Sequence, residues 1–137
     1  MEKFNFTQKT AQIAQRAYEL NIKARKQGLK ILVNDIDAEM LKNQDVFEIG
    51  ISLAAQGVDL EFISGVLQNK IDMEQDKMLK RVKIIQKTAV LCIHENINSW
   101  MMFSAIFSYI SVNEQEEIRK HLKDKVFTEY FQMYLGA

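Results

Sequence analysis

The residue types best suited to nucleophilic chemistry in this chain are Cys92, His94 and His121, and there are no other cysteines or histidines. Cys92 and His94 are the types that form a nucleophile and its general base. Two positions apart on a helix, however, their side chains point roughly 200° apart. A free cysteine usually packs as a small apolar residue. We therefore predict that Cys92 belongs to the core and that the chain has no catalytic residues.

Metal-binding patterns are incomplete. A structural zinc site usually needs four ligands, more than one cysteine and two separated histidines provide. His121 follows Glu114 and Glu117 at spacings of seven and four, whereas helical di-iron sites use Glu-x-x-His. The acids of Asp72–Lys77 resemble the start of an EF-hand loop, but lysine stands where that loop needs glycine. The five glycines are scattered and form no phosphate-binding loop. We predict no metal and no cofactor.

The composition predicts one folded domain, spanning residues 1–137. Apolar residues make up 47% and charged residues 26%, as in globular proteins. Lys plus Arg equals Asp plus Glu, at 18 each, which argues against a nucleic-acid binder that depends on overall positive charge. A lone cysteine cannot form an internal disulfide, so we expect a reducing, cytoplasmic environment.

No segment has the length and apolarity of a membrane span. The first residues lack the apolar core of a signal peptide. The nearest candidate for a span, residues 99–112, is too short. We interpret it as a buried core helix, while a helix lying on a bilayer remains the alternative.

The absence of proline and the spacing of the apolar residues predict an all-α fold, a compact bundle of about five to six helices. Asn5 or Thr7 can cap a first helix that ends at Gly28. The polar stretch Asp35–Asn43 is expected to hold one short helix.

The middle of the chain is more apolar. Residues 44–57 predict a buried helix in which Gly50 allows another helix to approach closely and Gly57 ends the helix. Asp59 can cap the following helix. We favour one long central helix from about residue 60 to 95, with two helices meeting near Asp72 as the alternative.

The last third predicts two more helices. The stretch His94–Asn98 breaks the pattern, and Ser99 can cap an apolar helix that continues through Ile110. Ser111 with Glu114, or Asn113 with Glu116, has the spacing of a capping box. A stripe of apolar residues then predicts a single last helix reaching Tyr134.

Residues 22–71 carry a longer pattern. A basic helix end precedes a Gly-Leu pair, then a polar stretch with acidic residues, an apolar helix ending in glycine, and a helix opened by aspartate. The positions that carry this pattern are Arg25, Gly28, Leu29, Asp35, Phe47, Gly50, Leu53, Gly57, Asp59, Ile63 and Leu67. The pattern resembles the cytoplasmic loop of the MotA flagellar stator family, within the MotA/TolQ/ExbB superfamily.

The resemblance covers the cytoplasmic loop alone, because the family's four membrane helices and the prolines along its ion path have no counterpart here. In that family the loop uses charges to grip the rotor. Arg25 matches the basic position. Eight residues later, where the family pattern expects an acid, stands Val33, with Asp35 nearby.

We therefore expect a non-enzymatic protein-interaction module of the bacterial flagellar motor, docking on stator, rotor or its own copies at the cytoplasmic face of the inner membrane. The apolar content of the last two helices predicts homo-oligomerisation. The alternative is a peripheral membrane or lipid-binding regulatory module built on residues 99–112, and a helical enzyme is the least favoured. The expected protein-binding residues, of which the last three could instead be core, are Lys23, Arg25, Lys26, Lys30, Trp100, Met101 and Met102.

Overall fold

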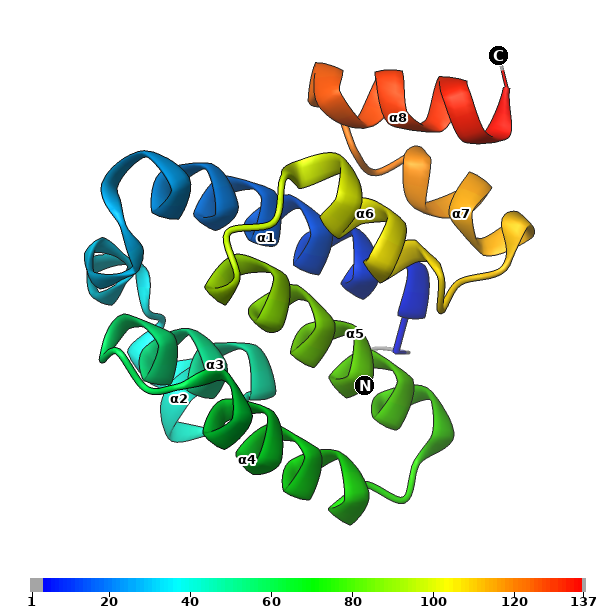
Figure 1. Cartoon of the computed structure of the whole chain (residues 1–137). Helices are drawn as coiled ribbons and strands as arrows, with labels where there is room; N and C mark the ends of the chain where they lie inside the picture. The colour runs from blue at the N-terminus through cyan, green and yellow to red at the C-terminus, as the bar shows by residue number, and fades with distance from the viewer. Residues whose placement is uncertain (1–3, 137) are drawn as a thin grey trace.

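A computed structural model describes residues 4–136, and every regular element in this range is a helix (Figure 1). The elements are α1 (Phe6–Gln27), the 3₁₀ helix η1 (Leu29–Asp35), α2 (Ala38–Lys42), α3 (Val46–Ala55), α4 (Leu60–Met73), α5 (Lys77–His94), α6 (Ser99–Phe107), α7 (Val112–Arg119) and α8 (Lys125–Leu135). The all-α prediction is confirmed. The described range holds eight α-helices and one 3₁₀ helix, more than the five to six expected.

Side-chain caps explain where most helices begin. Across residues 4–136, every α-helix except α8 starts after a residue whose side-chain oxygen accepts a hydrogen bond from a backbone N–H three positions later. These capping residues are Asn5, Asp37, Asp45, Asp59, Asp76, Asn98 and Ser111. Such caps satisfy N–H groups that have no partner within the helix. The predicted caps Asn5 and Asp59 are confirmed, and the cap of α6 is Asn98 rather than Ser99.

The first connection follows the sequence prediction. Gly28 ends α1 with φ of 87°, and its N–H donates to the carbonyl oxygen of Ala24 at 2.7 Å. A side chain with a Cβ is strained at this φ, so glycine suits the position. The short helix expected within Asp35–Asn43 is α2.

The centre of the molecule is α5, which contacts α1, α3, α4 and α6. Gly50 permits the crossing of α3 and α5, because a Cβ at this position would lie 2.7 Å from both Cγ atoms of Val90. Real Cβ atoms do not approach other carbons so closely, so a larger residue at position 50 would push the two helices apart. The predicted role of Gly50 is therefore confirmed.

The single long central helix was a wrong prediction, because the chain turns back on itself between α4 and α5 (Figure 1). Glu74 leaves the helical region with ψ of 127°, and Asp76 caps α5 by accepting from the N–H of Leu79 at 2.9 Å. The carboxylate of Glu74 pairs with Lys83 at 3.0 Å. These local bonds compete with helix continuation, and the alternative of two helices is the one observed.

The predicted last helix is also divided, into α7 and α8. Ser111 and Glu114 form the expected capping box at the start of α7. Asp124 then adopts an extended backbone before α8, and its carboxylate accepts from Nε2 of Gln15 at 2.9 Å. The apolar residues of the predicted stripe are therefore divided between α7 and α8.

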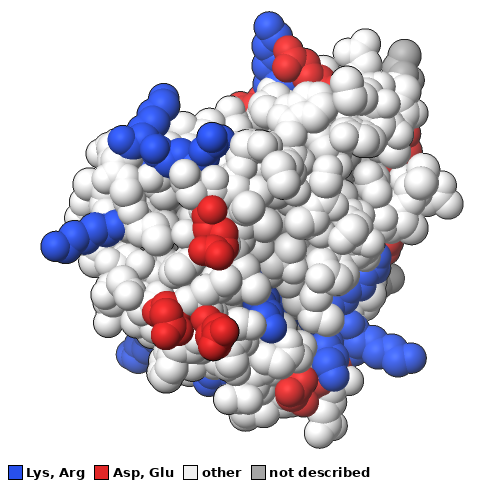
Figure 2. Space-filling view, in the orientation of Figure 1, with Lys and Arg blue, Asp and Glu red and all other residues white. Residues whose placement is uncertain are grey.

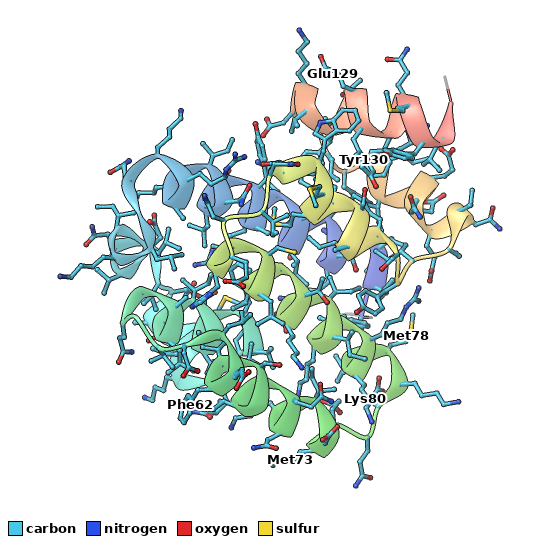
Figure 3. The ribbon with its side chains drawn as sticks, viewed as in Figure 1. Phe62, Met73, Met78, Lys80, Glu129 and Tyr130 are labelled. Atoms are coloured by element: carbon cyan, nitrogen blue, oxygen red, sulfur yellow. The ribbon has the colours of Figure 1, made fainter. Side chains whose placement is uncertain are left out.

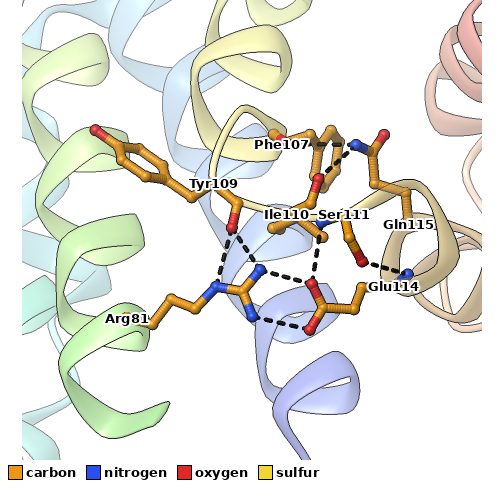
Figure 4. Close-up of polar contacts among 7 residues, drawn as sticks. All are labelled: Arg81, Phe107, Tyr109, Ile110, Ser111, Glu114 and Gln115. Atoms are coloured by element: carbon orange, nitrogen blue, oxygen red, sulfur yellow. Dashed lines mark hydrogen bonds and ion pairs between the residues drawn. The ribbon is translucent and has the colours of Figure 1, made fainter. Parts of the chain in front are cut away.

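Arg81 of α5 fixes the loop between α6 and α7 (Figure 4). Its guanidinium donates to both carboxylate oxygens of Glu114, at 2.8 and 2.6 Å, and its Nε donates to the carbonyl oxygen of Tyr109 at 2.9 Å. Gln115 donates to the carbonyl oxygen of Ile110 at 2.9 Å. The Arg81 guanidinium holds the pKa of Glu114 at about 2, well below its ordinary value. This loop is therefore fixed by polar contacts.

Within residues 4–136, no helix has both the length and the apolarity that crossing a bilayer requires.

Candidate protein-binding site

The last turn of α1 carries the predicted basic residues. Arg25 and Lys26 lie in that turn, and Lys30 follows in η1. All three side chains are exposed, and none takes part in a hydrogen bond or ion pair with another part of the chain within residues 4–136. Positive charge is favoured at a helix C-terminus, where the carbonyl groups leave a partial negative charge. The three cations are thus available to an outside partner.

Lys23 behaves differently from the other three. Its Nζ lies 2.8 Å from Oδ2 of Asp35, at the end of η1, and both side chains are half-buried. This ion pair ties the end of η1 to α1. Lys23 therefore stabilises the local fold, and the exposed positive charge comes from the remaining three residues.

An ion pair with a fully buried carboxylate joins the middle of α1 to α3. Glu48 of α3 is 0% exposed, and the guanidinium of Arg16 binds both of its carboxylate oxygens. Nη2 of Arg16 also donates to the carbonyl oxygen of Asp35 at 2.7 Å, and the N–H of Asp37 donates to Oε1 of Glu48 at 2.9 Å. The Arg16–Glu48 pair therefore joins α1 and α3 to the end of η1 and to the residue that caps α2. This pair was not predicted from the sequence, although a single acidic residue in the apolar segment of α3 indicated that its charge needs a partner.

The start of α6 lies beside the same end of α1 (Figure 1). Asn21, which is fully buried, donates from Nδ2 to the carbonyl oxygen of Ile97 at 2.8 Å. Its Oδ1 accepts from the hydroxyl of Ser99 at 2.7 Å. Asn21 stands one helical turn before Arg25. The start of α6, which carries the predicted Trp-Met-Met segment, is therefore fixed to α1 one turn before Arg25.

The Trp-Met-Met segment divides between surface and core. Met101 is 59% exposed, and Trp100 is partly buried against the rings of Tyr130 and Tyr134, at 5.5 and 6.2 Å between centroids. Met102 is 0% exposed, so the prediction that it contacts a partner is wrong. Adjacent residues on a helix point about 100° apart, and here the rotation of α6 turns Met102 inward.

Burial of α6 also weakens the lipid-binding alternative. Its apolar residues Met102, Phe103, Ile106 and Phe107 all lie in the core. A helix that lies on a bilayer needs such residues on its outer face. The outer face of α6 instead carries Met101 together with Ser104 and Ser108.

The residues first considered for catalysis have other roles. Burial raises the pKa of the Cys92 thiol, which disfavours the reactive thiolate. Cys92 is half-buried and packs against the core, as predicted. Nε2 of His94 lies 3.0 Å from the carbonyl oxygen of Val58, in the loop before α4. Among residues 4–136, no three His, Cys, Asp or Glu side chains are grouped as a metal site would need.

A polar cleft of about 500 Å³ runs beside α1. Both of its cations are held by carboxylates, Arg16 by Glu48 and Lys23 by Asp35. The other polar residues of the lining are Gln8, Gln12, Gln15, Glu19 and His121. The cleft thus offers hydrogen-bonding groups, but its arginine and lysine are held by neighbouring acids.

Comparisons of the chain with protein-family models, with curated proteins and with solved structures found no match.

Proposed function

We propose that this chain is a non-enzymatic protein-binding module of the bacterial flagellar motor. It docks through a surface, here called the basic end, formed by Arg25, Lys26, Lys30 and Met101. The observation that supports the proposal most is that three exposed cations have no counter-ion within residues 4–136. The Arg16–Glu48 pair, whose carboxylate is fully buried, joins α1, the helix that carries Arg25 and Lys26, to α3.

The chemistry of the basic end specifies its partner. Arginine binds carboxylates with two parallel hydrogen bonds, and lysines add point charges that speed association. Methionine fills irregular apolar surfaces. The partner segment is therefore acidic and carries at least one apolar side chain. Because the cations are exposed, binding weakens as salt is added.

The resemblance to the MotA cytoplasmic loop supplies the flagellar part of the proposal. Arg25, at the position of the family's basic contact, is exposed. Val33 is exposed where the family pattern expects an acid, and nearby Asp35 is held by Lys23. We infer that the basic end supplies positive charge only, and that the module acts in the cytoplasm beside the motor.

The test is affinity capture from the native cells with the tagged full chain. The first variant is Arg25→Glu, Lys26→Glu, and its matched control is Lys123→Glu, Lys125→Glu near the start of α8, which changes the net charge equally. We expect wild type and control to recover stator or rotor proteins, and the first variant to lose them about tenfold or more. Recovery of no motor protein by wild type, or equal recovery by both variants, would overturn the proposal.

A further inference from the structure

The polar cleft beside α1 follows the helix over several turns. The residues of α1 that line it run from Gln8 to Lys23, which corresponds to about 22 Å along the helix axis. A small molecule usually occupies a pocket that encloses most of its surface. An extended polypeptide rises about 3.3 Å per residue, so about seven of its residues fit along this cleft.

Side-chain amides are the main hydrogen-bonding groups that remain free in the cleft. Within residues 4–136, no hydrogen bond engages the side-chain amides of Gln8 and Gln12, and Gln15 uses only its Nε2. An amide side chain both donates and accepts, so it can bind the N–H and the carbonyl oxygen of a peptide group. Successive turns of α1 are about 5.4 Å apart, and an extended chain presents groups to the same side about every 6.6 Å. Flexible glutamine side chains can follow this difference.

The charges of the cleft leave one acid unpaired in its middle. The cations Arg16 and Lys23 are already held by carboxylates. Glu19 is exposed, accepts from Nε2 of Gln15 at 3.1 Å, and takes part in no ion pair within the part of the chain that the structure describes. The neighbouring segment Lys123–Lys125 has charges of both signs and is not among the lining residues. Glu19 therefore offers a negative charge to a ligand.

The same face of α1 continues to the basic end. Positions 8, 12, 15, 19, 23 and 26 are separated by three or four residues, so Lys26 lies on the face that lines the cleft. Figure 2 shows basic side chains at the upper left, over the region where Figure 1 places the end of α1 and η1. Lys26 and Glu19 are about 10 Å apart along the helix, a distance that three residues of an extended chain span.

We propose that the partner of the basic end is an extended peptide segment that continues from Lys26 along this cleft toward Gln8. The inference rests on the proposed function, because it starts from the acidic partner described there. The segment carries an acidic residue against Lys26 and a basic residue three positions away against Glu19. Neutral residues follow, and the amides of Gln8 and Gln12 bind their backbone. The opposite charges of Lys26 and Glu19 thus favour a segment of mixed charge over a uniformly acidic one.

The cleft is expected to add modestly to affinity. An exposed ion pair changes affinity by up to about fivefold. Hydrogen bonds from the amides are partly offset by the cost of ordering the segment. We expect a segment that occupies both the basic end and the cleft to bind about threefold to tenfold more tightly than one that reaches only the basic end.

The test is an NMR titration of the ¹⁵N-labelled full chain with synthetic peptides capped at both termini. The short peptide is Glu-Leu-Glu. The long peptide adds two serines, a lysine and five serines, and it is also made in reversed order so that both chain directions are sampled. We expect the short peptide to shift the backbone signals of Arg25, Lys26 and Lys30. In one of its two orders, the long peptide should also shift the side-chain amide signals of Gln8 and Gln12.

The charge requirement is tested with a second long peptide, in which glutamate replaces the lysine. We expect wild type to bind it about threefold less tightly than the mixed-charge peptide, and Glu19→Lys to reverse this preference. The matched control is Glu129→Lys, which makes the same charge change on α8, where Figure 3 labels Glu129. This control should keep the preference of wild type.

The amides are tested with the double variant Gln8→Ala, Gln12→Ala. Both side chains are exposed and alanine favours helix, so circular dichroism is expected to show an unchanged fold. The variant should bind the long peptide no more tightly than the short one, and the short peptide as wild type does.

The outcomes separate this inference from the proposed function. A short peptide that leaves the basic-end signals unmoved would contradict the proposed acidic partner and this inference together. A short peptide that binds, with long peptides that bind no more tightly and leave the Gln8 and Gln12 signals unmoved, would overturn this inference alone. Equal effects of Glu19→Lys and Glu129→Lys on the peptide preference would also overturn it.

Discussion

Two arginine–glutamate pairs, one in each half of the chain, make the same kinds of contact. Arg16 binds Glu48, the carbonyl oxygen of Asp35 and the ring of Phe47, whose centroid lies 5.2 Å from the guanidinium carbon. Arg81 binds Glu114, a carbonyl oxygen in the α6–α7 loop and the ring of an α1 phenylalanine, at 4.3 Å. Each arginine thus binds a carboxylate, a backbone carbonyl oxygen and an aromatic ring.

The carboxylates of the two pairs differ in their exposure to water, whereas the two arginine side chains are about equally exposed. Glu48 is 0% exposed, whereas the side chain of Glu114 is 27% exposed. A buried carboxylate that loses its cation remains as an uncompensated charge in a medium of low polarity, but a carboxylate in contact with water can be solvated again. The same three kinds of contact therefore have different consequences when one partner is removed.

The largest expected effect follows from Arg16→Met. This change leaves the Glu48 carboxylate buried without its cation, so we expect the free energy of unfolding to fall by about 3 to 5 kcal/mol. Urea unfolding followed by circular dichroism measures the loss. Because the cations of the basic end lie on α1 and η1, the same variant should also raise the rate of backbone hydrogen exchange there.

The control for that prediction is the double variant Arg16→Met, Glu48→Gln. The neutral amide keeps an acceptor for the N–H of Asp37 and removes the buried charge. We expect it to recover about half of the lost stability. If the single variant lost no more than the corresponding change at Arg81, the contrast between buried and hydrated pairs would be wrong.

Contacts between residues close in the sequence were predictable, and contacts between distant residues were not. Caps such as Asn5, Asp59 and Ser111 act within three residues, and the sequence analysis predicted them. The Arg16–Glu48 pair joins residues 32 positions apart, and no local pattern relates the two.

The sequence alone also does not determine where the helices break or which face of α6 is buried. Residues 74–76 and 120–124 fit a continuing apolar period as well as they fit a turn. At the first break Asp76 caps the next helix locally. At the second break Asp124 accepts a hydrogen bond from Gln15, which is distant in the sequence. Met101 and Met102 have the same residue type, and the packing of α6 alone turns one outward and the other inward. The exposure of Arg25, Lys26 and Lys30 follows the general tendency of charged side chains to lie at the surface. Glu48, which is 0% exposed, departs from that tendency.

A smaller loss is expected for Arg81→Met. Glu114 gains access to water when the guanidinium is removed, so only the net value of charge-assisted hydrogen bonds is lost, about 2 kcal/mol. The α6–α7 loop also loses the donor to the carbonyl oxygen of Tyr109. Urea unfolding gives the change. A loss as large as that of Arg16→Met would show that exposure does not separate the two pairs.

The smallest expected effect is the pH dependence of the hydrated pair. The pKa of Glu114 is lowered from 4.5 to about 2, chiefly by its hydrogen bond with Arg81. The ionised carboxylate therefore adds stability that is complete above about pH 4.5 and is lost as the pH falls toward 2. The pKa shift sets an upper limit of roughly 3 kcal/mol, and partial exposure reduces the expected value to about 1 kcal/mol.

The measurement is urea unfolding of wild type and Glu114→Gln at pH 7 and pH 3. We expect the difference between them to shrink by about this amount at the lower pH. In the Arg81→Met background the same comparison should show almost no change with pH, because the cation that lowers the pKa of Glu114 is gone. A pH dependence that survives in that background would mean that Ser111, the other hydrogen-bond donor to this carboxylate, sets the pKa.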